Sequence, residues 1–121
     1  MTQTRILIVD DDSVILELLV EQLGEHGFSV LTAGGVDAAM AVLAGESPAL
    51  VLADIRMAPR DGFDLLGEIR GRFPKIPVVL MSSFSPPGAA ERASRAGAAG
   101  FLRKPFTEAE MLKSLSDALV A

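Results

Sequence analysis

Short apolar runs alternate along the chain with longer segments in which apolar residues recur every three or four positions. Uninterrupted apolar runs are typical of strands that are buried on both faces, and the wider spacing is typical of helices with one buried side. The runs predict five strands, which cover residues 5–9, 28–31, 49–53, 77–81 and 99–102. Helical patterns lie between them, so the chain is expected to alternate strand and helix throughout.

The first helical pattern has a well-marked start and end. Asp12 or Ser13 is expected to cap its N-terminus, and Gly27 is expected to end it in a left-handed conformation. A helix of this kind packs one apolar face on a sheet. The spacing places six residues on that face: Val14, Ile15, Leu18, Leu19, Gln22 and Leu23.

Helices are also expected after each of the other strands. Two of them fit residues 36–44 and 62–72, with inward residues at Val36, Met40 and Leu43 and at Leu65, Leu66 and Ile69. The last helix begins with a capping box formed by Thr107 and Glu110. Its buried stripe consists of Met111, Leu112, Leu115 and Leu119.

The segment before the fifth strand, residues 88–100, is rich in alanine and glycine. A fourth helix between Pro87 and Gly97 has only alanines as apolar anchors, at Ala89, Ala90, Ala93 and Ala96. An alanine face buries little apolar area, so this helix is expected to be held weakly. Its amide hydrogens should exchange fastest among the helices.

Alternating helices and apolar strands predict an α/β fold, in which a parallel sheet is covered by helices on both faces. Right-handed crossovers leave few strand orders, and 2-1-3-4-5 is the natural one for five strands. We therefore expect a flavodoxin-like (βα)5 three-layer sandwich. The length of 121 residues suits one domain over residues 1–121.

Composition narrows the functional classes. The formal net charge of -5 argues against direct nucleic-acid binding, which depends on the neutralisation of phosphates. The absence of cysteine favours a reducing compartment, and no apolar stretch reaches the roughly 20 residues that a membrane span needs. The N-terminal residues also lack the pattern of a signal peptide. We therefore expect a cytoplasmic domain without a membrane partner.

Charged and hydroxyl side chains stand at the carboxyl ends of four of the predicted strands. They are Asp10 and Asp11 after the first strand, Asp54 after the third, Ser82 and Ser83 after the fourth, and Lys104 after the fifth. These ends share one edge of a parallel sheet, and ligands bind where the strand order switches, so the groups are expected to meet. Clustered carboxylates repel unless their pKa values rise or a cation binds, and an all-oxygen set favours Mg²⁺.

A metal ion, a hydroxyl, an ammonium and a carboxylate are the groups needed to move a phosphoryl group onto that carboxylate. The metal and Lys104 would neutralise the phosphoryl oxygens, Ser82 would donate a hydrogen bond, and Asp54 would attack in line. The sequence therefore predicts phosphoryl transfer to Asp54.

With these residues, the chain resembles the receiver domain of bacterial two-component response regulators over essentially its whole length. The resemblance rests on motifs that follow one another in the family's order. They are the acidic pair Asp10-Asp11, Asp54 at the phosphoacceptor position, Asp61-Gly62, Ser82 at the switch hydroxyl, Phe101 at the switch aromatic, and Lys104-Pro105-Phe106.

The resemblance implies a signalling domain, not an enzyme, which accepts a phosphoryl group from a sensor histidine kinase or a phosphotransfer protein. It also implies a Mg²⁺ site made by four residues: Asp10, Asp11, Asp54 and, through its backbone carbonyl, Arg56. Ser82 and Phe101 would then move with the phosphoryl group and remodel the face formed by the fourth helix, the fifth strand and the fifth helix. Many receivers form homodimers through that face.

The chain departs from the family's pattern beside the expected site. Proline stands at Pro59, whereas most receivers have it one position earlier, where this chain has Ala58. The sequence therefore does not predict the backbone path of the loop that follows Asp54. Phe84 lies two positions beyond Ser82, where its bulk is expected to hinder the attacking water and to prolong the life of the aspartyl phosphate.

Two other functional classes stay open. Residues 10–14 also fit the motif of haloacid-dehalogenase-type phosphatases, in which Asp10 would be the nucleophile. That family has a further acidic metal motif near its C-terminal end, where this chain offers only Glu108, Glu110 and Asp117 on a helix. The other class is a docking pseudo-receiver that is not phosphorylated, which the intact set of site residues disfavours. Phe101 by itself would also fit plain core packing.

Overall fold

The computed structural model describes residues 3–83 and 87–120, which fold into one parallel sheet between two layers of helices. The strands are β1 (Arg5–Val9), β2 (Ser29–Ala33), β3 (Leu50–Asp54), β4 (Val78–Ser82) and β5 (Gly100–Arg103). The helices are α1 (Ser13–Glu25), α2 (Val36–Gly45), α3 (Gly62–Arg72), α4 (Ala89–Arg95) and α5 (Glu108–Val120). The strand order is β2-β1-β3-β4-β5, so the predicted fold class is confirmed.

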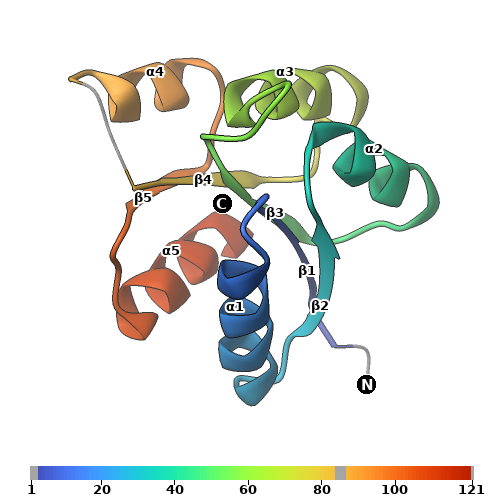
Figure 1. The fold of residues 1–121 in the computed structure, drawn as a ribbon, viewed down its shortest axis with the longest axis vertical. Coiled ribbons are helices and arrows are strands. Elements are labelled where there is room, and N and C mark those ends of the chain that lie inside the picture. The colour runs from blue at the N-terminus through green and yellow to red at the C-terminus, as the bar shows by residue number, and fades with distance from the viewer. Residues whose placement is uncertain (1–2, 84–86, 121) are drawn as a thin grey trace.

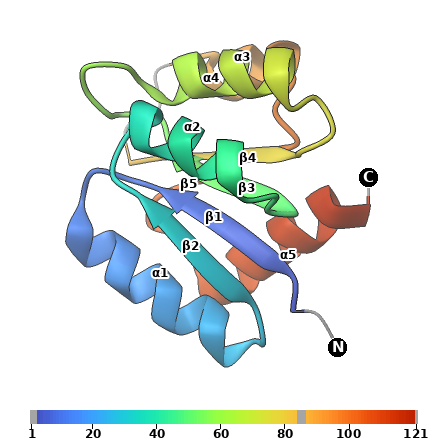
Figure 2. The same cartoon turned by 90° about the vertical axis from the view of Figure 1, so that its right-hand side faces the viewer.

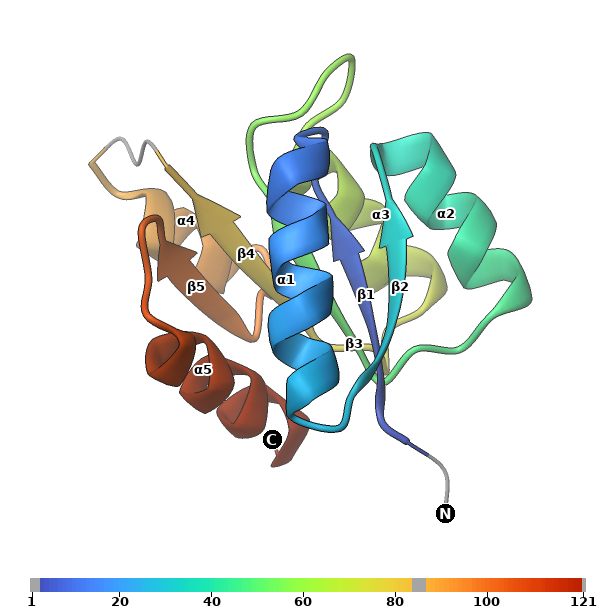
Figure 3. The same ribbon diagram turned by 60° about the horizontal axis from the view of Figure 1, so that its bottom comes forward.

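The helices divide unequally between the two faces of the sheet. Helices α2, α3 and α4 cover one face, and α1 and α5 cover the other (Figures 1 and 2). All strands point the same way (Figure 3), and therefore their carboxyl ends share one edge. The side chains of each strand alternate between the two faces, so that the sheet separates two apolar clusters.

The apolar runs are nearly uninterrupted because the strands are covered by helices on both faces. On β1, Leu7 and Val9 pack with α2 and α3, whereas Ile6 and Ile8 pack with α1 and α5. All four side chains are fully buried. A strand that is covered on both faces has no position for a polar side chain until its end, where the covering helices stop.

Four of the predicted strands are shifted toward their carboxyl ends. β2 covers Ser29–Ala33 instead of residues 28–31, and β3, β4 and β5 each begin and end one residue later than predicted. The hydrogen-bonded ladder sets these limits, and it continues past the apolar run to pair Asp54 with Met81 and Ser82 with Arg103. The two polar residues are therefore held in the sheet itself and do not follow it.

The buried face of α1 is narrower than the sequence predicts. Leu19 and Leu23 are buried and Ile15 is half-buried, but Val14 is 69% exposed and Leu18 is 49% exposed. Positions 15, 19 and 23 lie four apart and form the row that faces the sheet, and the neighbouring row at 14 and 18 faces solvent. The prediction that Val14 and Leu18 point inward is therefore wrong.

The predicted helix ends agree with the structure. Asp12 caps α1, because its Oδ1 accepts hydrogen bonds from Val14 N at 2.9 Å and from Ile15 N at 3.4 Å. Gly27 has a φ of 85°, the left-handed conformation expected after that helix. Before α5, Thr107 N donates to Glu110 Oε1 at 2.8 Å, and Glu110 N donates to Thr107 Oγ1 at 3.0 Å.

The buried faces of the other long helices match their apolar spacing. The inward residues predicted for α2 and α3 are all buried. On α5, Met111 and Leu115 are buried, and Leu112 and Leu119 are half-buried against the same cluster. By contrast, α4 has seven residues and buries only Ala89 and Ala93, while Ala96 is exposed and lies beyond its end. The structure therefore agrees with the prediction that α4 has few apolar anchors.

Gly62 brings the start of α3 against the end of β3. A Cβ atom at this position would lie 2.5 Å from the carbonyl oxygen of Asp54 and 2.8 Å from Ile55 Cα. Both are backbone atoms of the strand end, which cannot turn aside as a side chain can. Gly62 therefore permits the close approach of α3 to the residue that carries the candidate site.

We expect Gly62→Ala to lower the free energy of unfolding by about 1–3 kcal/mol, because the added methyl group overlaps the backbone of β3. The matched control is Gly67→Ala on the same helix, where an added Cβ meets open space. That change should raise the free energy of unfolding by about 0.5–1 kcal/mol, since glycine is unfavourable within a helix. Urea unfolding of the two variants measures both values. Equal stability of Gly62→Ala and the wild type would contradict the close approach.

Candidate functional site

The strand ends bring the predicted site residues to one edge of the sheet. Asp10 follows β1 directly, and Val9 pairs with Ala53, so Asp10 and Asp54 occupy corresponding positions on adjacent strands. Ser82 is the last residue of β4, and Lys104 follows β5. β1 and β3 are the strands between which the chain order of the sheet switches, which is where ligands bind in open α/β sheets.

Asp10 is a buried carboxylate with both oxygens engaged. Its side chain is 1% exposed. Oδ1 accepts a hydrogen bond from the backbone N–H of Asp12 at 2.9 Å, and Oδ2 accepts one from Lys104 Nζ at 2.9 Å. The backbone N–H of Asp10 in turn donates to Ala33 O at 3.1 Å. These contacts hold Asp10 rigidly at the base of the site.

Asp54 has fewer contacts than Asp10. It is 6% exposed, and its Oδ1 lies 3.3 Å from Lys104 Nζ, close enough for an ion pair. Among the described residues, no donor meets hydrogen-bond geometry at this buried oxygen. Burial raises the pKa of Asp54 above its ordinary value of 3.8; Lys104 opposes the shift, and the charges of Asp10 and Asp11 add to it. The carboxylate of Asp54 is therefore held charged at a cost.

Lys104 pairs with both buried carboxylates. Its side chain is 17% exposed, so it points inward toward Asp10 and Asp54. Burial by itself would lower the pKa of Lys104, but the hydrogen bond to Asp10 and the charge of Asp54 outweigh burial and raise it. The ammonium therefore stays protonated and provides a fixed positive charge beside Asp54.

Three carboxylates form a group that could hold a metal ion. One oxygen from each of Asp10, Asp11 and Asp54 lies within 4.8 Å of the others. Asp11 is exposed, whereas the other two are buried, so the group opens toward solvent on one side. An all-oxygen set with one open side suits Mg²⁺, which keeps several of its waters. The oxygen of Asp54 that accepts no hydrogen bond from the described residues also fits this role.

The loop that carries Arg56 is tightly held at its start. The carbonyl oxygen of Ile55 accepts hydrogen bonds from Met57 N at 3.1 Å and from Gly62 N at 2.8 Å. Met57 is buried in the cluster under α2 and α3, while the side chain of Arg56 is exposed. The backbone around Arg56 is thus fixed beside the carboxylates, and its carbonyl stays a predicted metal ligand.

The two predicted switch residues differ in their surroundings. Ser82 is 1% exposed, and its backbone carbonyl accepts a hydrogen bond from Lys104 N at 2.8 Å. Phe101 is half-buried against the apolar cluster under α4. It lines a cavity of about 150 Å³ together with Ala90, Ala93 and Ser94 of α4. The ring therefore lies beside α4, where a change of its position would reach that helix. Phe84, the residue expected to prolong the aspartyl phosphate, lies outside the described residues.

Two arginines near the site were not expected from the sequence. Arg60 lies in the loop before α3 and forms ion pairs with Asp37 of α2 and, at 2.6 Å, with Glu68 of α3. Arg92 of α4 places its guanidinium carbon 3.9 Å from the centre of the Phe63 ring. Arg60 is 23 positions from Asp37 and 8 from Glu68, and Arg92 is 29 positions from Phe63. No periodic pattern in the sequence marks such pairs.

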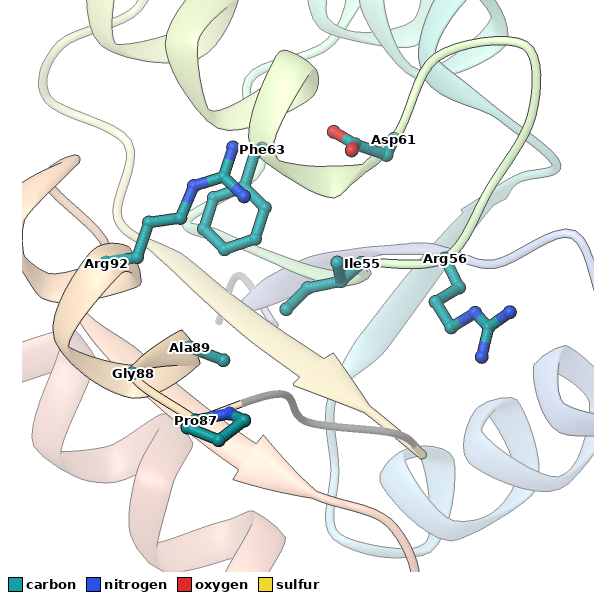
Figure 4. Close-up of a pocket in the computed structure, with 8 residues that line it drawn as sticks. All are labelled: Ile55, Arg56, Asp61, Phe63, Pro87, Gly88, Ala89 and Arg92. Carbon is teal, nitrogen blue, oxygen red and sulfur yellow. The ribbon is translucent and has the colours of Figure 1, made fainter.

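A pocket of about 350 Å³ separates the end of β3 from α4 (Figure 4). Ile55 and Arg56 line it on one side, and Pro87, Gly88 and Ala89 line it on the other. The remaining wall is made by Asp61, Phe63 and Arg92, with the Arg92 guanidinium beside the Phe63 ring (Figure 4). The start of α4 and the residues after Asp54 thus face one another across this space.

The family model that matches the chain is that of the response regulator receiver domain, and the match covers residues 6–116. The chain belongs to this family, so the resemblance found in the sequence is confirmed. Its function is that of a receiver domain, and the phosphatase and the pseudo-receiver are not favoured. The described residues include no helix long and apolar enough to cross a membrane.

The relatives and solved structures agree with this assignment. Response regulator protein FleR of Pseudomonas aeruginosa is 39% identical over 108 residues, which are 89% of this chain and 23% of FleR. The DNA-binding transcriptional regulator NtrC of Salmonella typhimurium is 38% identical over 106 residues, 88% of this chain and 23% of NtrC. The chain thus spans about a quarter of the length of these relatives.

Two solved structures superpose closely. The receiver domain of NtrX from Brucella abortus has a TM-score of 0.90 at 35% identity, covering 96% of this chain and 98% of that domain. A response regulator receiver domain protein from Clostridium thermocellum has a TM-score of 0.91 at 28% identity, covering 97% and 94%. Both are separate receiver domains, so the similarity extends over the whole fold.

In EDTA at neutral pH, we expect Asp54→Asn to melt at a higher temperature than the wild type. The folded-state pKa of Asp54 lies above its ordinary value, so the native state binds a proton more tightly than the unfolded state. The free energy of unfolding therefore falls as the pH rises from the ordinary pKa through the folded-state pKa of Asp54. The neutral amide of the variant does not ionise and avoids this fall. The advantage of Asp54→Asn should shrink as the pH falls to 3.8 and below, because the carboxyl then becomes protonated in both states. Thermal melts across this range measure it, and a pH-independent difference would exclude the explanation.

Proposed function

We propose that Asp54 accepts a phosphoryl group from the phosphohistidine of a sensor histidine kinase or a phosphotransfer protein. The observation that carries this proposal is the state of its carboxylate. It is buried, and its Oδ1 lies 3.3 Å from Lys104 Nζ but accepts no hydrogen bond from the described residues. A carboxylate that is costly to keep charged and has few hydrogen bonds to give up is suited to become an acyl phosphate.

The transfer needs an attacking oxygen, a leaving group and charge stabilisation. A carboxylate oxygen of Asp54 forms a bond to phosphorus while the P–N bond of the phosphohistidine breaks, and the imidazole leaves with the electron pair. Lys104 faces the equatorial oxygens with its ammonium, which the neighbouring carboxylates keep protonated. The Ser82 hydroxyl donates a hydrogen bond to one of these oxygens. Water later attacks the phosphorus and releases inorganic phosphate.

The metal in this proposal is Mg²⁺, held by the carboxylates of Asp10, Asp11 and Asp54 and by the carbonyl of Arg56. When bound, it neutralises the charge of the phosphoryl oxygens. The separation of the three carboxylates supports this assignment, and so does the exposure of Asp11, which leaves room for water ligands.

The contacts of Asp10 favour Asp54 as the nucleophile. Both oxygens of Asp10 accept hydrogen bonds, one from Asp12 N and one from Lys104. A nucleophile must give up such bonds before it attacks, which adds to the barrier. With Asp54 as the nucleophile, the proposed role is that of a signalling domain that assists its own phosphorylation and dephosphorylation.

The output of phosphorylation is proposed to pass through Ser82 and Phe101 to the face formed by α4, β5 and α5. The position of Phe101 beside α4, and the two small side chains that anchor that helix, support this route. A homodimer through this face is one outcome. We place the domain in the cytoplasm, because a chain without cysteine suits a reducing compartment.

The transfer is tested with acetyl phosphate and Mg²⁺, followed by mass spectrometry of peptides. We expect one added phosphoryl group on Asp54, and none in Asp54→Ala or when EDTA replaces the metal. Asp10→Ala should reduce the rate of labelling by removing a metal ligand and a partner of Lys104. Label that persists in Asp54→Ala but vanishes in Asp10→Ala would instead identify Asp10 as the nucleophile and favour the phosphatase.

Mg²⁺ should also raise the melting temperature of the wild type. An ion that binds only the native state adds about 2.7 kcal/mol of stability at one hundred times its dissociation constant. Asp11→Asn should melt above the wild type in EDTA, since it relieves carboxylate repulsion, and it should lose most of the response to Mg²⁺. Glu21→Gln on α1 removes a carboxylate outside the cluster and should respond like the wild type. A wild type that melts identically with and without the ion would contradict the proposed metal site.

A further inference from the structure

Helix α4 is attached to the rest of the domain by small side chains. Its buried residues are Ala89 and Ala93, each of which buries far less apolar area than the leucines of α1 and α5. Elements with few buried apolar contacts open at low free-energy cost. Any further contact of α4 therefore contributes a large share of what holds the helix in place.

The contact between α4 and α3 is made by arginine side chains. Arg92 of α4 lies over the ring of Phe63 at the start of α3, with 3.9 Å from the guanidinium carbon to the ring centre (Figure 4). Beyond the end of α4, Gly97 has a φ of 100°, and a Cβ there would lie 2.9 Å from Cδ of Arg70. The side chain of Arg70 is itself held by a hydrogen bond to Ile76 O. The aliphatic part of Arg70 thus lies against the turn after α4, and the guanidinium of Arg92 lies over Phe63 of α3.

The Arg92–Phe63 contact joins α4 to the phosphoacceptor strand. Phe63 directly follows Gly62, whose N–H donates to Ile55 O at 2.8 Å and whose Cα lies against the Asp54 backbone. The Phe63 ring is therefore fixed relative to Asp54. Arg92 and Phe63 also form the wall of the pocket that separates Ile55 and Arg56 from the start of α4 (Figure 4). A movement of α4 relative to Asp54 has to change this contact.

We propose that Arg92 is a positioning residue that restrains the switch. Its stacking on Phe63 stabilises the position that α4 has when Asp54 is unphosphorylated. In that state the carboxylate of Asp54 is paired with Lys104. Phosphorylation then has to break or weaken the stacking as α4 moves. This inference rests on the proposed function, because it concerns the equilibrium that a phosphoryl group on Asp54 shifts.

The size of the effect follows from the exposure of the contact. Arg92 is solvent-exposed and Phe63 is half-buried. Exposed cation–π contacts change an equilibrium constant by about two- to five-fold. A contact present in only one of two conformations shifts their equilibrium by its full contribution. Removal of the guanidinium should therefore raise the population of the switched arrangement by about that factor.

The test measures the binding of beryllofluoride, a phosphoryl mimic, in the presence of saturating Mg²⁺. Arg92→Gln is expected to bind the mimic about two- to five-fold more tightly than the wild type. Phe63→Leu, which keeps an apolar side chain against the core, should show a gain of the same direction. The matched control is Arg95→Gln, which removes the same charge from the same helix at an exposed position with no ring contact among the described residues. It should bind like the wild type.

Hydrogen exchange provides a second measurement on the same variants. Without the mimic, the amides of residues 88–97 should exchange fastest among the helices in the wild type, and faster still in Arg92→Gln but not in Arg95→Gln. With the mimic, the difference between Arg92→Gln and the wild type should disappear. A residue that only stabilised the fold would show faster exchange without any gain in affinity for the mimic.

The outcomes separate this inference from the function on which it rests. Tighter binding in both Arg92→Gln and Phe63→Leu, with an unchanged Arg95→Gln, supports the restraint. Unchanged or weaker binding in Arg92→Gln overturns it, and so does an equal gain in Arg95→Gln, which would reflect net charge alone. If the wild type fails to bind beryllofluoride with Mg²⁺, the proposed phosphoacceptor site fails instead.

Discussion

The pairing of Lys104 with two buried carboxylates is the interaction on which the site depends. Asp10 and Lys104 are 94 positions apart in the sequence, and the ion pair exists only because the sheet brings the ends of β1 and β5 to one edge. One ammonium cannot neutralise Asp10, Asp54 and the nearby Asp11 together. Burial is the main reason that the pKa of Asp54 is raised, and the excess negative charge adds to that shift and suits the group to a cation. Because the carboxylates outnumber the ammonium of Lys104, a further charged group at the site changes how Lys104 is shared among its partners.

The rest of the fold divides into a rigid part and a loosely attached part. β1 and β3 are buried on both faces, and Gly62 allows α3 to contact the backbone of Asp54 directly. These contacts fix the positions of Asp54 and Asp10. Helix α4 is anchored by two alanines and by an arginine on an aromatic ring. A charge event in the rigid part can therefore move the loosely attached part without disturbing the core, which is the arrangement that a switch needs.

The surface of α1 shows how burial and hydrophobicity differ. Val14 and Leu18 are apolar yet exposed, whereas Asp10 and Asp54 are charged yet buried. Apolar spacing identifies a helix and its approximate buried side, but the width of the covered stripe depends on how close the neighbouring helix stands. Asp54 is buried because it ends β3 while the neighbouring β4 continues past it, and Asp10 is buried directly after β1, where Asp12 N and Lys104 Nζ donate hydrogen bonds to it.

The sequence by itself determined the order of the elements, the fold class and the identity of the residues at the strand ends. Each of these follows from local periodicity and from the chain geometry of parallel strands. The sequence placed β2 to β5 slightly early, because hydrogen-bond register, which depends on neighbouring strands, decides where a strand ends. The tertiary structure alone decided which row of α1 faces solvent, and it alone paired Arg92 with Phe63 and Arg60 with Asp37. Such pairs join separate helices and loops, and long flexible side chains reach partners that no local pattern specifies.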